Sequence, residues 1–256
     1  MWQKTLSAIV WATVMVAGVP AGVEVRAQAA LPEGASLLDG HVKASGGRAA
    51  FDRLTTRVAK ARTDVTGANV SMAATMWAAR PNRALTVIES DLVGRIERGF
   101  DGTVGWELST TGGPRVLEGS ELDDAARDNV FDGLASWRDW VAKVETQGAA
   151  VVDGRPAWKV LLTPKVGSAR TYYFDQASAL VVEVETVVRT AAGDVPVASF
   201  ASDYRDVGGV LMPHRLRQVA AGRELVTTFE SIAHNVEIPA GRFDLPKEVL
   251  ALVPKK

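Results

Sequence analysis

The sequence predicts an α+β protein in which one large antiparallel sheet carries a few helices. Three observations lead to this class. From Thr55 onward, apolar and polar residues alternate with period two and β-branched residues are frequent, which is typical of half-buried strands. Asp-Gly pairs at Asp101 and Asp153 indicate tight hairpin turns between antiparallel neighbours. Helical spacing is confined to residues 36–54 and 120–142.

The first 29 residues are predicted to be a signal peptide. Lys4 supplies positive charge, residues 5–23 are apolar, and the small-residue site Ala-Gln-Ala predicts cleavage after Ala29. We therefore expect two parts, a signal peptide at 1–29 and a single domain at 30–256. The alternative is an uncleaved membrane anchor, because the apolar run approaches spanning length.

The predicted export, the absence of cysteine and the net charge restrict where the protein is located, how it is stabilised and which partners it has. A signal peptide followed by a globular body predicts an exported protein, most simply a periplasmic one. With no cysteine in 256 residues, we expect neither a lipid attached through cysteine nor disulfides, so stability depends on core burial. The formal net charge of −1 argues against a nucleic-acid partner, which usually requires a basic face.

Two helices are expected before the sheet. Residues 36–39 match a capping box, and Gly46 with Gly47 provides a helix end. A second short helix is expected at 48–54. Strands or hairpins are then expected at residues 55–65, 69–79, 83–90, 94–100, 103–109, 149–164, 169–190, 197–220 and 224–238.

One helical segment interrupts the strands. Residues 120–123 form another capping box, and helical spacing continues to residue 142. Trp137 and Trp140 are three residues apart, so they share a helix face. The acidic residues near the start of this segment complement the helix dipole rather than indicating a carboxylate site. The tail from Phe243 is expected to be extended.

No motif indicates catalysis, a metal or a cofactor. His41, His214 and His234 are far apart in sequence, and none belongs to an H-E-x-x-H motif. No serine lies in G-x-S-x-G, and no phosphate-binding glycine loop is present. We therefore predict a protein that is not an enzyme and that has no cofactor, metal site or catalytic residue.

The stretch "SDYRDVGGVLMPHRL" resembles a polar site, but alternation predicts a hairpin with its turn at 207–209. Asp203 and Arg205 then point to one face, whereas Tyr204 points to the other. His214 shares a face with Leu216, and the pattern leaves open whether that face meets solvent or a cavity.

The strands place apolar side chains on one face of the sheet and charged ones on the other. Taken alone, this pattern favours a filled core. A curved sheet whose mouth is plugged by helices would instead leave an apolar cavity. Methionine and aromatic side chains suit a pocket that adapts to flexible acyl chains.

The chain resembles the LolA-like family, the outer-membrane lipoprotein-sorting proteins and their LppX-type relatives. The resemblance covers Leu31 to about Val249 and is carried by "HVKASGGRAAFDRLTTRV", "GFDGTVGWELSTTGGPRVLEG", "TYYFDQASALVVEVET", "SDYRDVGGVLMPHRLRQ" and "FESIAHNVEIPAGRFDLPKEV". It implies a large curved antiparallel sheet forming a half-open β-barrel with an α-helical lid. It also implies a hydrophobic cavity for acyl chains, without catalysis.

Strand alternation, helix placement and this resemblance together predict the residues of a binding site. The expected cavity residues are Met72, Met76, Leu85, Val87, Trp106, Leu108, Trp158, Val160, Leu162, Tyr172 and Phe174. The expected lid residues are Phe131, Trp137 and Trp140.

The functional hypothesis is a non-catalytic periplasmic carrier or binding protein for lipid or lipoprotein acyl chains, with envelope membrane proteins as donor or acceptor. One alternative is an envelope interaction or sensor domain with a filled barrel. The other is a hydrolase of lipids or cell-wall material. Fold analogy does not decide among them.

Overall fold

The computed structural model describes residues 30–253 except residue 93 and residues 191–192, and the predicted signal peptide lies outside this range. Within the described residues, thirteen strands form one antiparallel sheet in the order β6-β5-β4-β3-β2-β1-β13-β12-β11-β10-β9-β8-β7. The sheet is not closed, because β6 and β7 form two separate edges. The predicted α+β class, with one large antiparallel sheet, is confirmed.

The strands are β1 Thr56–Val65, β2 Ser71–Ala79, β3 Arg83–Ser90, β4 Gly94–Phe100, β5 Gly105–Ser109, β6 Gly113–Val116, β7 Val141–Val152, β8 Arg155–Pro164, β9 Arg170–Asp175, β10 Val181–Thr190, β11 Gly193–Val207, β12 Val210–Ala220 and β13 Arg223–His234. The helices are α1 Gly34–Ala44, α2 Arg48–Asp52, α3 Gly119–Asp128, the 3₁₀ turn η1 Gly133–Ser136, α4 Trp137–Trp140 and α5 Lys247–Leu250.

The sheet consists of two meanders joined by one long-range pairing. Strands β1 to β6 follow one another from strand to neighbouring strand, and so do β7 to β13. The first and last strands then pair, with Ala59 opposite Ile232. This pairing unites strands that are far apart in the chain, and it makes a single curved surface out of two sets of hairpins.

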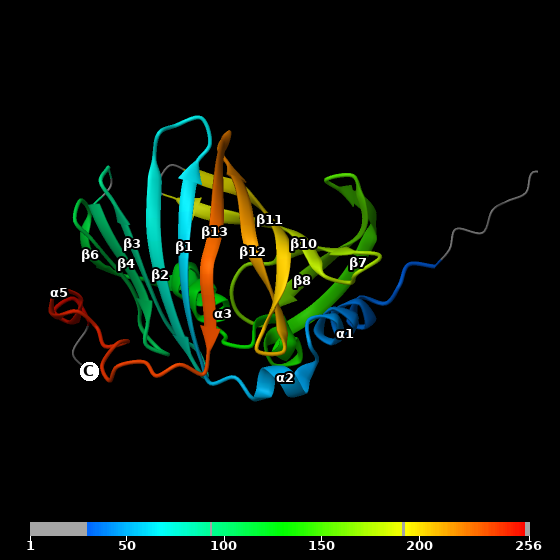
Figure 1. The fold of residues 1–256 in the computed structure, drawn as a ribbon, viewed down its shortest axis with the longest axis horizontal. Helices are drawn as coiled ribbons and strands as arrows, with labels where there is room; N and C mark the ends of the chain where they lie inside the picture. The colour runs from blue at the N-terminus through cyan, green and yellow to red at the C-terminus, as the bar shows by residue number, and fades with distance from the viewer. Residues whose placement is uncertain (1–29, 93, 191–192, 254–256) are drawn as a thin grey trace, which may run out of the picture. The chain divides into compact units, whose positions relative to one another are not determined.

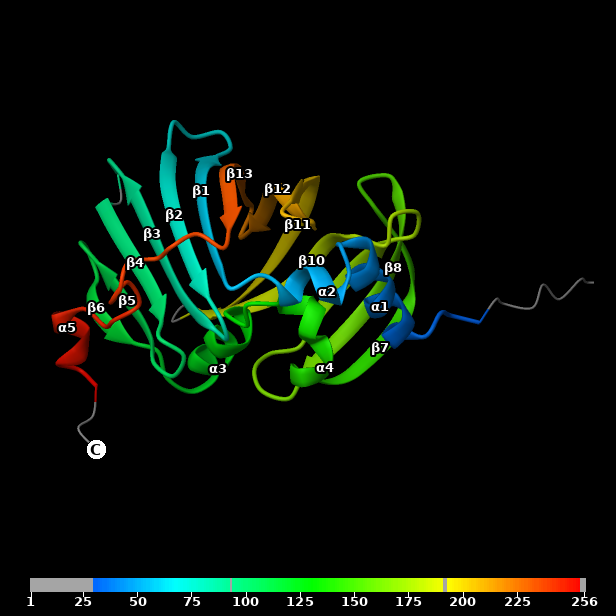
Figure 2. The same ribbon diagram turned by 60° about the horizontal axis from the view of Figure 1, so that its bottom comes forward.

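The sheet bends around helices α3 and α4, so that the face toward these helices is concave (Figure 1, Figure 2). Helix α1 also packs on this face, against β7. The segment after β13 runs across the opposite, convex face toward α5, which contacts β5 and β6 (Figure 2). The helices on the concave face form the lid that was expected over the sheet.

Each face of the sheet has its own apolar core. The concave-face core lies at the β7–β10 end, where Leu38 of α1 and Trp137 of α4 pack on Val160, Leu162 and Phe174. A separate cluster of Val152, Ala157, Tyr173 and Val182 lies on the convex face of the same strands. The main convex-face core, termed the convex-face core below, lies at the other end. It contains Ala79, Leu85, Val87, Trp106, Phe243 and Val249, and its last two members come from the C-terminal segment.

Several helix predictions were wrong in extent. The expected helix over 120–142 is three short elements. Helix α3 already ends at Asp128, and Gly133, with a φ of 51°, lies in the left-handed region through which an α-helix does not continue. Strand β7 therefore begins at Val141 instead of residue 149. Neither α1 nor α3 has a side-chain cap, so the two capping boxes do not form. The tail expected to be extended contains α5.

Candidate functional site

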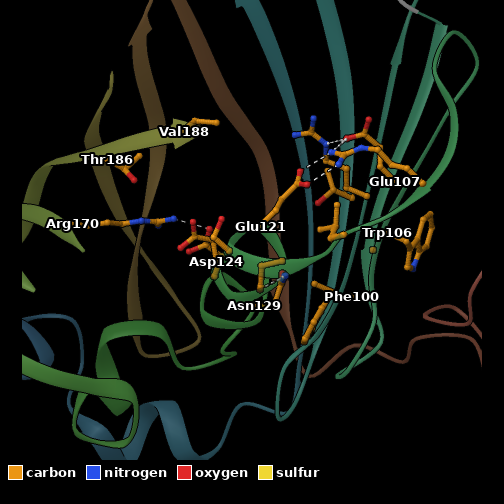
Figure 3. A pocket seen from close by; sticks show the side chains of 18 of the residues that line it. Phe100, Trp106, Glu107, Glu121, Asp124, Asn129, Arg170, Thr186 and Val188 are labelled. Atoms are coloured by element: carbon orange, nitrogen blue, oxygen red, sulfur yellow. Dashed lines mark hydrogen bonds and ion pairs between the residues drawn. The ribbon is translucent and has the colours of Figure 1, made fainter. Parts of the chain in front are cut away.

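Two neighbouring cavities lie on the concave face. The first, termed the apolar cavity, has a volume of about 310 Å³, and twelve of its sixteen lining residues are apolar. The second, termed the charged cavity, has a volume of about 410 Å³ and is shown in Figure 3. Ala84, Thr86, Asp128 and Asn129 line both cavities, so the two are adjacent compartments under one lid.

Strand register explains the apolar cavity. Ala59 of β1 stands opposite Met76 of β2, and Met76 stands opposite Thr86 of β3, so these side chains share the concave face. Alanines at such positions leave open space that larger side chains would fill. The full lining is Arg57, Ala59, Met76, Trp77, Ala78, Ala84, Thr86, Asp128, Asn129, Val130, Phe131, Met212, Pro213, Leu216, Phe229 and Ile232.

Ion pairs hold α3 in place on both sides of the charged cavity. On one side, Arg115 of β6 pairs with Glu121 of α3 at 2.8 Å and also contacts Glu107 (Figure 3). Burial raises the pKa of Glu107, but the guanidinium groups of Arg98 and Arg115 outweigh it and lower that pKa overall. The Glu107 carboxylate is therefore ionised under physiological conditions.

On the other side, the end of α3 is held by the strand that carries Arg170. This arginine pairs with Asp128 at 2.8 Å, and the buried Arg127 contacts Asp124 and donates to the Ser168 carbonyl. Helix α3 is thus attached to β6 and to the region around β9, and it spans the concave face between them.

A buried carboxylate anchors the loop that follows α3. Both oxygens of Asp132 accept from Arg80 at the end of β2, at 2.5 and 2.7 Å, and one also accepts from Arg48 of α2 at 3.2 Å. Arg80 in addition donates to the Phe51 and Leu54 carbonyls. This anchor, termed the Asp132 clamp, connects the lid loop to β2 and α2.

The predicted cavity residues fall into three groups. Met76 lines the apolar cavity, and Met72 lies further along the same face of β2. Trp158, Val160, Leu162, Tyr172 and Phe174 lie on the concave face but pack with α1 and α4, in the concave-face core. Leu85, Val87, Trp106 and Leu108 lie on the convex face, packed with the C-terminal segment.

Strand alternation explains why the predicted cavity residues are divided between the two faces of the sheet. In β3 the cavity is lined by Ala84 and Thr86, so the alternating Leu85 and Val87 must point the other way. Figure 3 shows Trp106 pointing away from Glu107, its neighbour in β5. The sequence shows that these residues alternate but not that the second face is buried here, because on β3 and β5 that face is covered by the C-terminal segment.

The three expected lid residues all come from the segment on the concave face. Phe131 is buried and lines the apolar cavity, and its ring packs with the guanidinium groups of both Arg57 and Arg80. Trp137 and Trp140 both belong to the concave-face core, and the Trp137 indole donates to Asp39. Of the three, only Phe131 is placed to touch a ligand in the apolar cavity.

The hairpin at 202–216 forms as predicted. Asp203 pairs with Arg205 at 2.6 Å, whereas the Tyr204 hydroxyl donates to the Val181 carbonyl. His214 is buried, with Nδ1 3.0 Å from the Met212 carbonyl oxygen, so it does not face solvent. Among the described residues, no three His, Asp or Glu side chains gather in a geometry that would hold a metal ion.

The buried imidazole of His41 is expected to make the free energy of unfolding depend on pH. Burial against Phe174 lowers its pKa to about 4, although a contact with the Ala179 carbonyl opposes the shift. Below pH 6.5 the unfolded chain takes up a proton that the folded chain does not, so stability falls between pH 6.5 and about 4. In urea unfolding at pH 7 and 4.5, the wild type should lose about 2 kcal/mol more than His41→Gln. An equal loss in both proteins would contradict this assignment.

Comparison with known proteins addresses the fold. No protein-family model matches the sequence, and no curated protein matches it either. Among solved structures, a LolA superfamily protein from Nitrosomonas europaea is 14% identical, with a TM-score of 0.56 over 84% of this chain and 99% of its own. The chain has a LolA-like fold.

Two further structures agree with this LolA-like assignment. A DUF1329 family protein from Desulfovibrio piger is 13% identical, with a TM-score of 0.56 over 84% of this chain and 98% of its own. A putative outer-membrane lipoprotein-sorting domain from Vibrio parahaemolyticus is 9% identical, with a TM-score of 0.54 over 82% of this chain and 96% of its own. The LolA-like half-barrel and helical lid expected from the sequence are thereby confirmed as a fold.

Within residues 30–253, apart from the gaps noted above, no helix is both long and apolar enough to cross a bilayer.

Proposed function

We propose that this protein binds the acyl chain of a lipid or lipoprotein in the apolar cavity and carries it within the bacterial envelope. The observation on which this depends is a cavity of about 310 Å³, mainly apolar, between the concave face and the loop after α3. Burying a methylene group in such a space is worth about 0.8 kcal/mol, which is sufficient to draw an acyl chain out of water.

The lid supplies a route for entry and release. Phe131 covers the apolar cavity. The loop that carries it is held by the Asp132 clamp and by a hydrogen bond from the Phe131 amide to the Pro81 carbonyl, rather than by a continuous helix. The LolA-like fold, the predicted export signal and the lack of a catalytic motif agree with a carrier that performs no chemistry. Envelope membrane proteins would act as donor and acceptor.

A cavity-filling variant tests this function. Ala84→Phe puts a ring where Ala84 lines both cavities, so it should weaken binding of the neutral fluorophore 1-aminoanthracene at least about tenfold. Ala73→Phe is the matched control, because Ala73 is an exposed position on the convex face of the adjacent strand β2. Circular dichroism should show both variants folded.

Native mass spectrometry of the purified protein adds a measurement that needs no variant. We expect an adduct that organic solvent extracts as a lipid. A protein that carries no lipid and that also fails to bind 1-aminoanthracene would exclude the carrier function.

A second candidate is an envelope interaction domain that binds no lipid. It is favoured by the concave-face core, in which α1 and α4 fill the β7–β10 end of the half-barrel. It predicts the negative outcome of both measurements above.

A further inference from the structure

The guanidinium group of Arg57 faces the apolar cavity without a hydrogen-bonded or ion-paired anion, and the Asp132 carboxylate acts on it only at longer range. Arg57 lies on the concave face of β1, between Ala78 of β2 and His234 of β13. Its Cζ packs 5.5 Å from the centre of the Phe131 ring. Of the hydrogen bonds and ion pairs among the described residues, none reaches this guanidinium. A charged group held away from bulk water without an acceptor is costly, so the position favours an incoming anion.

The surrounding charges leave one positive charge in excess. Asp132 already forms ion pairs with Arg80 and Arg48, and Arg48 also pairs with Asp52 at 2.7 Å. Three arginines, with Arg57 included, thus face two carboxylates. The other carboxylate in the cavity lining, Asp128, is neutralised by its own pairs with Arg170 at 2.8 Å and Arg127 at 3.1 Å. His234 adds no charge at neutral pH, because burial and the nearby Arg57 lower its pKa. The excess charge is therefore that of Arg57, and it suits a monoanion.

The rest of the cavity suits a single flexible chain. Beyond Arg57, its lining includes Met76, Met212, Phe229 and Ile232. Methionine side chains adapt to irregular apolar ligands. A volume of about 310 Å³ is at the lower end for small-molecule sites, which favours one chain over two.

We infer, on the basis of the proposed function, that the apolar cavity selects a fatty acid, whose carboxylate pairs with Arg57 while its chain lies against Met76 and Ile232. A planar carboxylate matches the guanidinium fork and can accept two parallel hydrogen bonds from it. A phosphate dianion would bring a second negative charge toward Asp132, which is already surrounded by its own partners. Arg57 thus selects the anionic headgroup of the ligand, whereas the apolar side chains of the strands bind its alkyl chain.

The test compares an acid with an uncharged analogue of equal length. Dodecanoate and dodecanol each compete with 1-aminoanthracene for the purified protein at pH 7.5. The wild type should bind dodecanoate roughly tenfold to a hundredfold more tightly than dodecanol, which is the usual range for a charge-assisted contact. Arg57→Met should abolish this preference and leave dodecanol binding unchanged. Arg57→Lys should keep part of it.

Arg62→Met is the matched control. Arg62 lies on the same strand, its side chain is 59% exposed, and its substitution removes the same charge from the convex face. It should keep the full preference for dodecanoate. Equal binding of acid and alcohol by the wild type would overturn the inference while leaving the carrier function intact, and so would a preference that survives in Arg57→Met. Failure of both compounds to bind would instead reject the carrier function itself.

Discussion

Asp132→Ala is expected to lower the free energy of unfolding by about 3 kcal/mol, because it leaves Arg80 without its carboxylate. The Asp132 side chain is only 6% exposed, and both of its oxygens accept from Arg80. Removing one partner of a buried pair is more damaging than replacing both, since the remaining charge is left unpaired. Urea unfolding at pH 7, followed by tryptophan fluorescence, measures the loss.

Asp52→Ala provides the control for this first prediction. Asp52 pairs with Arg48, which also contacts the Asp132 clamp, but its side chain is 52% exposed. Its loss should cost less than about 1 kcal/mol, as for other exposed ion pairs. Similar losses in the two variants would mean that burial of Asp132 does not determine the energy of the clamp. The clamp should also affect the lid, so Asp132→Ala is expected to release 1-aminoanthracene faster than the wild type.

Phe243→Ala is expected to lower the free energy of unfolding by about 3 kcal/mol and to leave the affinity for 1-aminoanthracene unchanged. Phe243 is 8% exposed and packs with Leu85, Val87 and Trp106 on the convex face. Truncation removes a large apolar side chain and leaves a void that the sheet cannot fill by moving. The apolar cavity is on the other face, so it should keep its shape.

Leu250→Ala is the matched control on the same segment. Leu250 lies in α5 and is 61% exposed, so its truncation should change stability by no more than about 0.5 kcal/mol. Denaturant unfolding and probe titration on the same samples separate the two effects. If Phe243→Ala weakened probe binding in fully folded protein, the convex-face core would have to be part of the ligand site after all.

Local sequence patterns predicted most of the hairpins. Asp101 and Asp153, each followed by glycine, stand at turns between strands, and alternation located β1 to β5 and β8 to β13 closely. These features depend on residues that are near one another in the chain, so they can be predicted without a structure. Strand β6, a four-residue edge strand, was not predicted, because its sequence "GPRV" is too short to alternate.

The site was only partly predictable. Met76 was expected in the cavity and Phe131 in the lid, and both side chains line the apolar cavity. Arg57, Phe229 and Ile232 were not expected, because β1 meets β13 through a pairing that no local turn signals. Leu85 and Trp106 were also expected in the cavity. They alternate as expected, but they pack on the face that the C-terminal segment covers, and Trp106 also borders the charged cavity.

The sequence by itself determined the class of fold, because alternation and turn chemistry act over a few residues and specify hairpins directly. Only the tertiary structure decided which apolar face is filled and which is hollow. That outcome depends on where α1, α4 and the C-terminal segment pack, and on the small side chains, such as Ala59 and Ala84, that remain under α3 and the loop after it. The tertiary structure also determines that Arg57 has no ion-paired carboxylate, since ion pairing depends on distances between segments that lie far apart in the chain.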